Sequence, residues 1–309
     1  MIKRIIAACV LTLSLCSCAA GDSSAEKTEV TPPFWKVIDE NTGGTVYLLG
    51  TMHAVKQDIT YPDYIMEAFD SCDTVAFELD YEDTDDMTQG IKHLLYDDGM
   101  TAKQCLGEDY AETVEFMKSK GLYSSYLDSY IPYYWASVFS SDIIEECGIS
   151  AEQGSDMYFF DLAKKDGKKK VPLESYSFQY EMMSDIPMEL QLLTLSDCIG
   201  EENYKGQIAE MNKLYAAWSS FDEEYFGKLE LFDEIPEGLE TQCSEMQVLM
   251  YDSRQRVMAD KAAEYLQKGE DLFLFVGAAH FYVGEDILTL LEEKGYTPVA
   301  VKEENKAAA

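Results

Sequence analysis

Two stretches that lie far apart in the sequence share one pattern of apolar and polar positions. Each contains an apolar run, a G-x-x-H tetrapeptide, an amphipathic segment and a second apolar run. These parts lie at residues 45–49, 50–53, 62–70 and 74–79 in the first stretch and at residues 272–276, 277–280, 284–294 and 297–301 in the second. Short, continuously apolar runs are typical of strands buried on both faces of a parallel sheet. The pattern predicts an α/β fold, with a mixed sheet core that holds two strand-GxxH-helix-strand units.

A largely helical insertion separates the two units. Prolines and glycines mark where its helices start and stop, as at Pro132, Gly148 and Gly167. Helices are predicted at residues 132–147, 155–166, 177–198 with an interruption near Pro187, 201–219 and 241–268, and a short strand is predicted at 170–173. No low-complexity stretch or proline-rich linker divides this region. We therefore expect one domain over residues 32–303, followed by a disordered tail at 304–309.

Histidine is rare in this chain, and two of its three histidines end the G-x-x-H tetrapeptides. His53 and His280 each follow an apolar run and a glycine. Ligands of open α/β sheets gather beyond the carboxyl ends of the strands, so we expect both imidazoles at that rim. A single histidine in such a place is more often structural, but the repeated context favours a binding site. His93, beside Lys92 in a polar segment, is expected at the surface.

Two glutamates stand at the ends of apolar runs in a similar way. Glu78 closes the run at 74–79 and Glu174 follows the run at 170–173. An unpaired buried carboxylate is very costly, so each either reaches the rim or serves as a helix cap or surface residue. If the four strands are neighbours, both glutamates converge with His53 and His280. Two imidazoles with one or two carboxylates suit a divalent transition metal that polarises a carbonyl or activates water.

The long helix predicted at 241–268 carries an apolar stripe with a charge inside it. Methionine, alanine and leucine recur every fourth residue along this stripe, and Arg254 takes one of these positions. A guanidinium that faces the core needs a carboxylate or a site that uses its charge. We favour this inward placement over an outward, solvated one. Arg256 lies on the opposite face and is expected in solvent.

The N-terminus predicts export and lipid attachment. Lys3 and Arg4 precede an apolar run at 5–15 that is shorter than the roughly 20 residues needed to span a bilayer. This run is typical of a signal peptide over residues 1–17. The following Leu15-Cys16-Ser17-Cys18 resembles a bacterial lipobox, which makes Cys18 the lipidated residue and 18–31 a flexible tether on the extracytoplasmic side of the cell membrane. Plain secretion and an uncleaved anchor are the alternatives.

The amino-acid composition bears on binding partners and on disulfide bonds. The formal net charge of -34 repels phosphate backbones, so we expect no nucleic acid partner. Five cysteines lie beyond the lipobox, and their odd number and wide spacing argue against a disulfide framework while leaving one disulfide open: Cys72, Cys105, Cys147, Cys198 and Cys243. A tyrosine cluster at 123–134 lines a groove or, more commonly for tyrosine, packs in the core.

These motifs give the chain its resemblance to the TraB/GumN family, which includes the pheromone-shutdown proteins and the TIKI metalloproteases. The likeness runs from Phe34 to Val301. It is carried by YLLGTMHAV at 47–55, FEL at 77–79, GSDMYFFDLAKKDGKKKVPLES at 154–175, Arg254 with Met258-Ala259, and FLFVGAAHFYVGEDILTLLEEKGY at 273–296. The order and spacing of these segments make the likeness more specific than any one tetrapeptide.

The resemblance implies a divalent-metal-dependent hydrolase, most similar in activity to a peptidase, with a peptide or protein as substrate. In the family the metal is Mn or Co, with Zn or Fe as alternatives, and the matching ligands here are His53, Glu78 and His280. Arg254 takes the place of an electrostatic helper, and Glu174 or Asp156 that of a general base or of a residue that orients a ligand. The chain departs from the family at Gln255, where Asn usually follows the arginine.

A rival interpretation is a surface lipoprotein that sequesters a peptide signal without cleaving it, as the pheromone-shutdown members do. A third is an esterase. The sequence leaves the oligomeric state open.

Overall fold

The core of the protein is a mixed sheet of six strands. The computed structural model describes residues 27–97 and 99–302. In spatial order the strands are β6 (Lys169–Glu174), β5 (Thr74–Leu79), β7 (Leu272–Gly277), β3 (Thr45–Thr51), β2 (Phe34–Ile38) and β8 (Val299–Ala300). The first four of these run parallel, β2 is antiparallel to β3, and β8 is antiparallel to β2. This arrangement confirms the predicted α/β fold with a mixed sheet.

Helices cover both faces of the sheet, and the apolar side chains of β7 point alternately toward one helix layer and the other. Leu274 and Val276 face α13 (Ser253–Lys268) and α14 (Ile287–Glu293), whereas Phe273 and Phe275 face α2 (Asp63–Ser71) and α7 (Ser155–Lys165). All four side chains have 0% exposure. A strand buried on both faces has to be apolar at every position, which explains the continuous run at 272–276.

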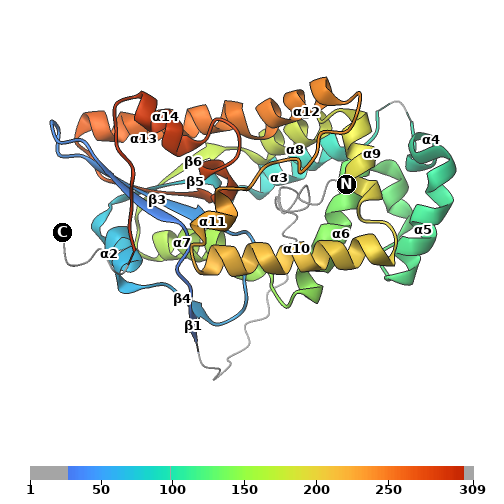
Figure 1. The fold of residues 1–309 in the computed structure, drawn as a ribbon, viewed down its shortest axis with the longest axis horizontal. Helices are drawn as coiled ribbons and strands as arrows, with labels where there is room; N and C mark the ends of the chain where they lie inside the picture. Colours follow the sequence, from blue (N-terminus) through green and yellow to red (C-terminus); the bar gives the residue numbers. More distant parts are fainter. Residues whose placement is uncertain (1–26, 98, 303–309) are drawn as a thin grey trace.

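The insertion between the two units is helical, as predicted. The further helices of the described residues are α3 (Thr84–Gly90), α4 (Ala102–Leu106), α5 (Tyr110–Ser119), α6 (Pro132–Glu146), α8 (Tyr176–Ser184), α9 (Met188–Ser196), α10 (Glu201–Ser219), α11 (Glu223–Phe226) and α12 (Glu240–Gln247). Figure 1 shows α4, α5, α6 and α9 at the end of the molecule away from the sheet. The predicted interruption near Pro187 separates α8 from α9. A π-helical segment at Val248–Asp252 joins α12 to α13.

The second repeated unit differs from the first in its closing half. Its helix α14 starts at Ile287 rather than near Gly284, because the side chain of Asp286 caps it by accepting the amides of Leu288 and Thr289. Its last strand, β8, spans two residues and forms the edge of the sheet beside β2, whereas β5 of the first unit pairs with β7. The likeness between the units therefore holds for the strand and its G-x-x-H ending.

The domain begins earlier than the sequence suggests. Strand β1 (Thr28–Glu29) pairs in parallel with β4 (Ile59–Thr60), and Val30 is 1% exposed in the core. The predicted tether over 18–31 is therefore wrong at its end, since an apolar valine and a strand pairing fix residues 28–31 to the domain. The predicted signal peptide over 1–17, the lipidated Cys18 and the tail at 304–309 lie outside the described residues. Within the described part, no helix is long and apolar enough to cross a bilayer.

The cysteines and tyrosines behave mainly as packing residues. All five predicted cysteines are free thiols, and three of them are buried. In the tyrosine cluster, Tyr133 and Tyr134 are 1% and 6% exposed, while Tyr126 is 56% exposed. The remaining short helical turns are η1 (Ile91–Leu94), η2 (Gly107–Asp109), η3 (Ser125–Ser129), η4 (Ala151–Gln153) and η6 (Ala278–Phe281).

Candidate functional site

The sheet brings the four predicted site residues of its parallel strands to one rim. Strands β6, β5, β7 and β3 are adjacent and parallel, and Thr51 pairs with Gly277, so the two G-x-x-H endings lie side by side. His53 follows β3, His280 lies in the turn η6 after β7, Glu78 is near the end of β5, and Glu174 ends β6. The adjacency that the sequence left as a condition is therefore met. His93, by contrast, is exposed on η1.

Gly277 marks the centre of the site. A Cβ placed on this glycine would lie 3.4 Å from Glu78 Oε1, 3.5 Å from His53 Nε2 and 3.9 Å from His280 Cδ2. Three of the predicted ligands thus surround one small space that a methyl group would fill. The Gly277 amide also donates a 2.7 Å hydrogen bond to Glu78 Oε1, which fixes this oxygen beside that space.

Asp156 orients His53. Its Oδ2 lies 2.8 Å from His53 Nδ1, and its Oδ1 accepts a hydrogen bond from the Thr51 hydroxyl. When the ring is neutral, a carboxylate on Nδ1 selects the tautomer with an unprotonated Nε2, and Nε2 is the atom that faces Gly277. Asp156 is placed there because Ser155, at the start of α7, bonds both the amide and the carbonyl of Met52. The position of Asp156 matches an orienting residue rather than a free general base.

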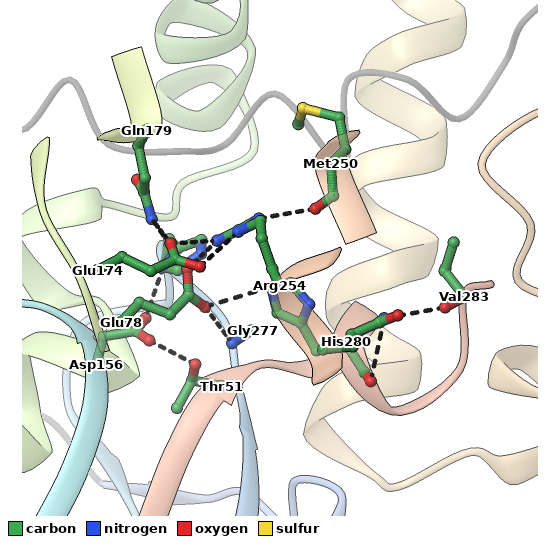
Figure 2. A network of polar contacts seen from close by, with 12 residues as sticks. Thr51, Glu78, Asp156, Glu174, Gln179, Met250, Arg254, Gly277, His280 and Val283 are labelled. Atoms are coloured by element: carbon green, nitrogen blue, oxygen red, sulfur yellow. Dashed lines mark hydrogen bonds and ion pairs between the residues drawn. The ribbon is translucent and has the colours of Figure 1, made fainter. Parts of the chain in front are cut away.

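Arg254 lies inside the protein, as the interrupted stripe predicted. Its side chain is 2% exposed and makes a two-point ion pair with Glu174, through Nε to Oε1 at 2.7 Å and Nη2 to Oε2 at 2.8 Å. Nη2 also donates to Glu78 Oε2 at 3.0 Å, and Nη1 donates to the carbonyl of Met250 at 2.9 Å (Figure 2). Most of the guanidinium donors are therefore committed to holding the two carboxylates. Arg256 is exposed, as predicted, and pairs with Glu285.

The backbone before Arg254 is unusual. The segment Val248–Asp252 is π-helical, so the helix has a wider turn, with one additional residue, immediately before Arg254. Such π-helical turns are rare in proteins overall, and those that occur often lie at functional sites. The same segment contains Met250, whose carbonyl accepts a hydrogen bond from Arg254.

Sequence reasoning missed several residues that complete this network. Gln179 of α8, 0% exposed, donates to Glu174 Oε2 at 2.8 Å and lies 3.4 Å from Glu78 Oε2. Trp218 of α10 donates its indole N–H to the carbonyl of Gly50 at 2.9 Å. The position of an amide on the apolar face of α8 was a usable signal for Gln179, while nothing local in the sequence links Trp218 to the strand end.

The two histidines differ in protonation. Burial opposes a charge on His53, but the Asp156 carboxylate outweighs burial and raises the pKa of His53 from 6.5 to about 9. Burial and then the charge of Arg254 lower the pKa of His280 well below 6.5. For Asp156, burial favours the neutral acid, yet His53 outweighs it and lowers the pKa of the carboxyl. At neutral pH, His53 is thus the protonated partner of Asp156 and His280 is neutral.

The donor set suits a divalent cation. Two imidazoles and a carboxylate oxygen border the space at Gly277, and the Nδ1 of His280 is buried without a hydrogen-bond partner among the described residues. Donors of one ion lie about 2.1 Å from it and roughly 3.0–3.4 Å from each other, whereas Glu78 Oε1 and His280 Nε2 are 3.8 Å apart. In the described part of the chain no group of three or more such side chains is arranged to hold an ion as it stands, so an ion held by these residues would need them to lie closer together.

The site forms the floor of a cavity of about 80 Å³. Its lining contains His53, Glu78, Arg254, Gly277 and His280, and its other lining residues are mainly apolar. A polar cluster at the carboxyl ends of parallel strands, in a largely apolar cavity, is the usual setting of a ligand site in open α/β sheets.

The sequence as a whole matches the model of the TraB/PrgY/gumN family over residues 33–300. The chain belongs to the TraB/PrgY/gumN family. This match confirms the resemblance carried by the two G-x-x-H segments and spans nearly all of the described residues. No curated protein and no solved structure matches the chain.

In this TraB/PrgY/gumN member, Gln255 follows Arg254 at the position where the resemblance led us to expect asparagine. Gln255 still holds the turn that carries His280. Gln255 is 0% exposed, and its Nε2 donates to the carbonyls of Val283 at 3.0 Å and His280 at 3.3 Å. The longer amide thus ties down the turn that carries His280. Its Oε1 has no hydrogen-bond partner among the described residues.

Proposed function

We propose that this protein is a divalent-metal-dependent hydrolase that acts on peptides. The observation that carries the proposal is the charge of the buried cluster. The cluster holds three nearly fully buried carboxylates, of which Glu78 and Glu174 contact the one buried guanidinium, Arg254, and Asp156 contacts His53. Buried charges need compensation because desolvation is costly. Arg254 and one divalent cation together neutralise the three carboxylates once His53 gives up its proton.

The residues that would hold the ion are His53 through Nε2, His280 and Glu78 through Oε1. A bound cation of this type polarises a carbonyl and lowers the pKa of a bound water. Manganese or cobalt is the expected metal from the family resemblance, with zinc or iron as alternatives. The charge count supports a divalent ion without choosing among them.

The remaining residues of the cluster aim these donors. Asp156 holds the Nδ1 side of His53, so that Nε2 faces Gly277. Glu174 holds Arg254, and Gln179 donates to Glu174. Arg254 in turn engages Oε2 of Glu78, which leaves Oε1 toward Gly277. In this arrangement Arg254 and Glu174 act as positioning residues, because the guanidinium donates hydrogen bonds to Glu174, Glu78 and the Met250 carbonyl.

The activity is tested by incubating the purified protein with a diverse peptide mixture and Mn(II), and reading the products by mass spectrometry. The hydrolase generates new termini that disappear with a chelator and in His53→Ala. The matched control is His93→Ala, since His93 is exposed and does not line the cavity, and it should cleave like the wild type. Absence of metal-dependent termini in the wild type rejects peptidase activity.

The rival function, sequestration of a peptide signal, uses the same cavity without turnover. It would appear as saturable peptide binding without new termini. An esterase would instead hydrolyse model esters and leave the peptide mixture intact.

We also propose that the protein is tethered outside the cell membrane through a lipid on Cys18. The support is the sequence of the leader and of Leu15-Cys16-Ser17-Cys18. The Cys18→Ser chain, compared with the wild type, should move from the detergent phase to the aqueous phase after detergent partitioning. Equal partitioning of the two proteins would refute the anchor.

A further inference from the structure

Five apolar side chains that line the cavity come from one continuous part of the chain, and we call them the apolar wall. Leu214 and Trp218 belong to α10, Phe226 ends α11, and Leu229 and Leu231 follow it. These side chains line the same cavity as His53, Glu78 and His280. A group bound in the cavity can therefore contact both these apolar side chains and the polar cluster.

This wall is fixed relative to the site. Trp218, 0% exposed, is hydrogen-bonded to the carbonyl of Gly50, at the end of the strand that leads to His53. Phe226 stacks on Tyr282 with ring centroids 4.7 Å apart, and Tyr282 follows the turn of His280. Each half of the wall is thus attached to one of the two G-x-x-H endings. A preformed wall selects a ligand by shape at a small cost in ordering.

One charged residue interrupts the wall. Glu230 lies between Leu229 and Leu231, lines the cavity and is exposed. Both oxygens of the deeper carboxylate, Glu78, are engaged by the Gly277 amide and by Arg254. Among the described residues, Glu230 has no hydrogen-bond or ionic partner. It is the cavity carboxylate that remains available to a cation on a ligand.

We propose that this wall is the substrate-binding subsite, which receives one aliphatic side chain next to the cleaved bond, and that Glu230 binds a positively charged group of the same peptide. The inference rests on the proposed function and extends it to a substrate class. The size of the cavity limits the side chain. About 80 Å³ is roughly half of a cavity that holds benzene, near 150 Å³. Valine, leucine or isoleucine fits this space better than tryptophan.

The first test changes the peptide and leaves the protein unaltered. Residues flanking the new termini are counted after digestion of a randomised peptide mixture by the wild-type protein with Mn(II). Burial of an aliphatic side chain predicts at least about tenfold enrichment of leucine, isoleucine and valine over asparagine at one position. Lysine or arginine within two residues should be enriched roughly two- to fivefold over glutamate, as for an exposed ion pair.

The second test changes the wall. Leu229→Asn should remove most of the aliphatic preference, and Glu230→Gln should remove the preference for a cationic neighbour. The matched controls are Ile235→Asn and Glu234→Gln, which lie exposed on the same segment outside the cavity and should keep both preferences. Thermal unfolding of each variant identifies any that lose their fold, and the peptide test above stands without them.

A third measurement reads binding without catalysis. Quenching of tryptophan fluorescence reports ligands at Trp218, and Trp218→Phe identifies that part of the signal. The probes are the amides acetyl-Lys-Leu, acetyl-Lys-Asn and acetyl-Glu-Leu, with and without Mn(II). Binding of acetyl-Lys-Leu amide at least about tenfold tighter than that of acetyl-Lys-Asn amide is expected.

The outcomes separate the inference from the function. Tight binding of the leucine probe without any cleavage supports the subsite and rejects the hydrolase. Cleavage without an aliphatic preference, or with tryptophan preferred to leucine, overturns the subsite and leaves the hydrolase standing.

Discussion

Replacing Gly277 by alanine fills the space between the three proposed ligands without disturbing the fold. The glycine has φ -48° and ψ 134°, a backbone conformation that alanine adopts freely. The added methyl carbon meets its nearest neighbours at 3.4, 3.5 and 3.9 Å, which are ordinary van der Waals distances. The metal-free protein should therefore accept it.

The expected magnitudes differ sharply between stability and metal binding. A strain-free glycine-to-alanine change stabilises a protein by roughly 0.4–1 kcal/mol through the unfolded chain, so the free energy of unfolding in a chelator should change by less than about 1 kcal/mol. An ion about 2.1 Å from its donors needs the volume that the methyl occupies. Loss of at least one of the three ligands should lower the affinity for Mn(II) about 100-fold or more.

Calorimetric titration with Mn(II) and urea unfolding in a chelator measure the two effects. Gly206→Ala is the control, because Gly206 is exposed in α10 and a Cβ there meets nothing within 4 Å. It should gain up to about 1 kcal/mol in stability and bind Mn(II) like the wild type. Gly277→Ala with wild-type affinity would show that no ion lies between Glu78, His53 and His280.

Three further changes test the cluster. Arg254→Met leaves Glu78 and Glu174 buried without their cation, so the metal-free protein should lose roughly 3–5 kcal/mol in urea unfolding at pH 7, and an unchanged unfolding curve would contradict the buried pairing. Because the pKa of His53 is raised to about 9, the proton it holds stabilises the metal-free fold below pH 6.5, and this contribution should disappear as the pH rises from about 6.5 through 9. A metal ligand has to lose that proton, so the affinity for Mn(II) should increase over the same range, and a flat profile would speak against His53 as a ligand. Asp156→Asn should lower the pKa of His53 in an NMR titration and weaken Mn(II) binding about 10- to 100-fold, whereas a pKa that stays near 9 would assign the shift to another group.

The sequence predicted the positions of the proposed ligands because they depend on strand ends. Continuous apolar runs identified β3, β5 and β7, and parallel strands bring whatever follows them to one rim. The same logic placed Glu174 correctly at the end of β6. Arg254 was found from a local pattern as well, since one charge in a buried stripe demands a partner.

The supporting residues could not be found in this way. Which oxygen of Glu78 meets Gly277 and which meets Arg254 depends on helices packed from distant parts of the chain. Gln179 and Trp218 reach the site through such packing, and neither stands in a motif. The short β8 was predicted too long because an apolar run at a sheet edge has no local signal for where pairing stops.

The central claim is that His53 and His280 hold one divalent ion, and metal analysis of the purified protein tests it most directly. Wild type and His93→Ala should each retain one manganese or cobalt ion per chain after dialysis. His53→Ala and His280→Ala should lose it while keeping a folded thermal transition. A wild-type protein that binds no divalent ion, or full occupancy in both site variants, would contradict the account.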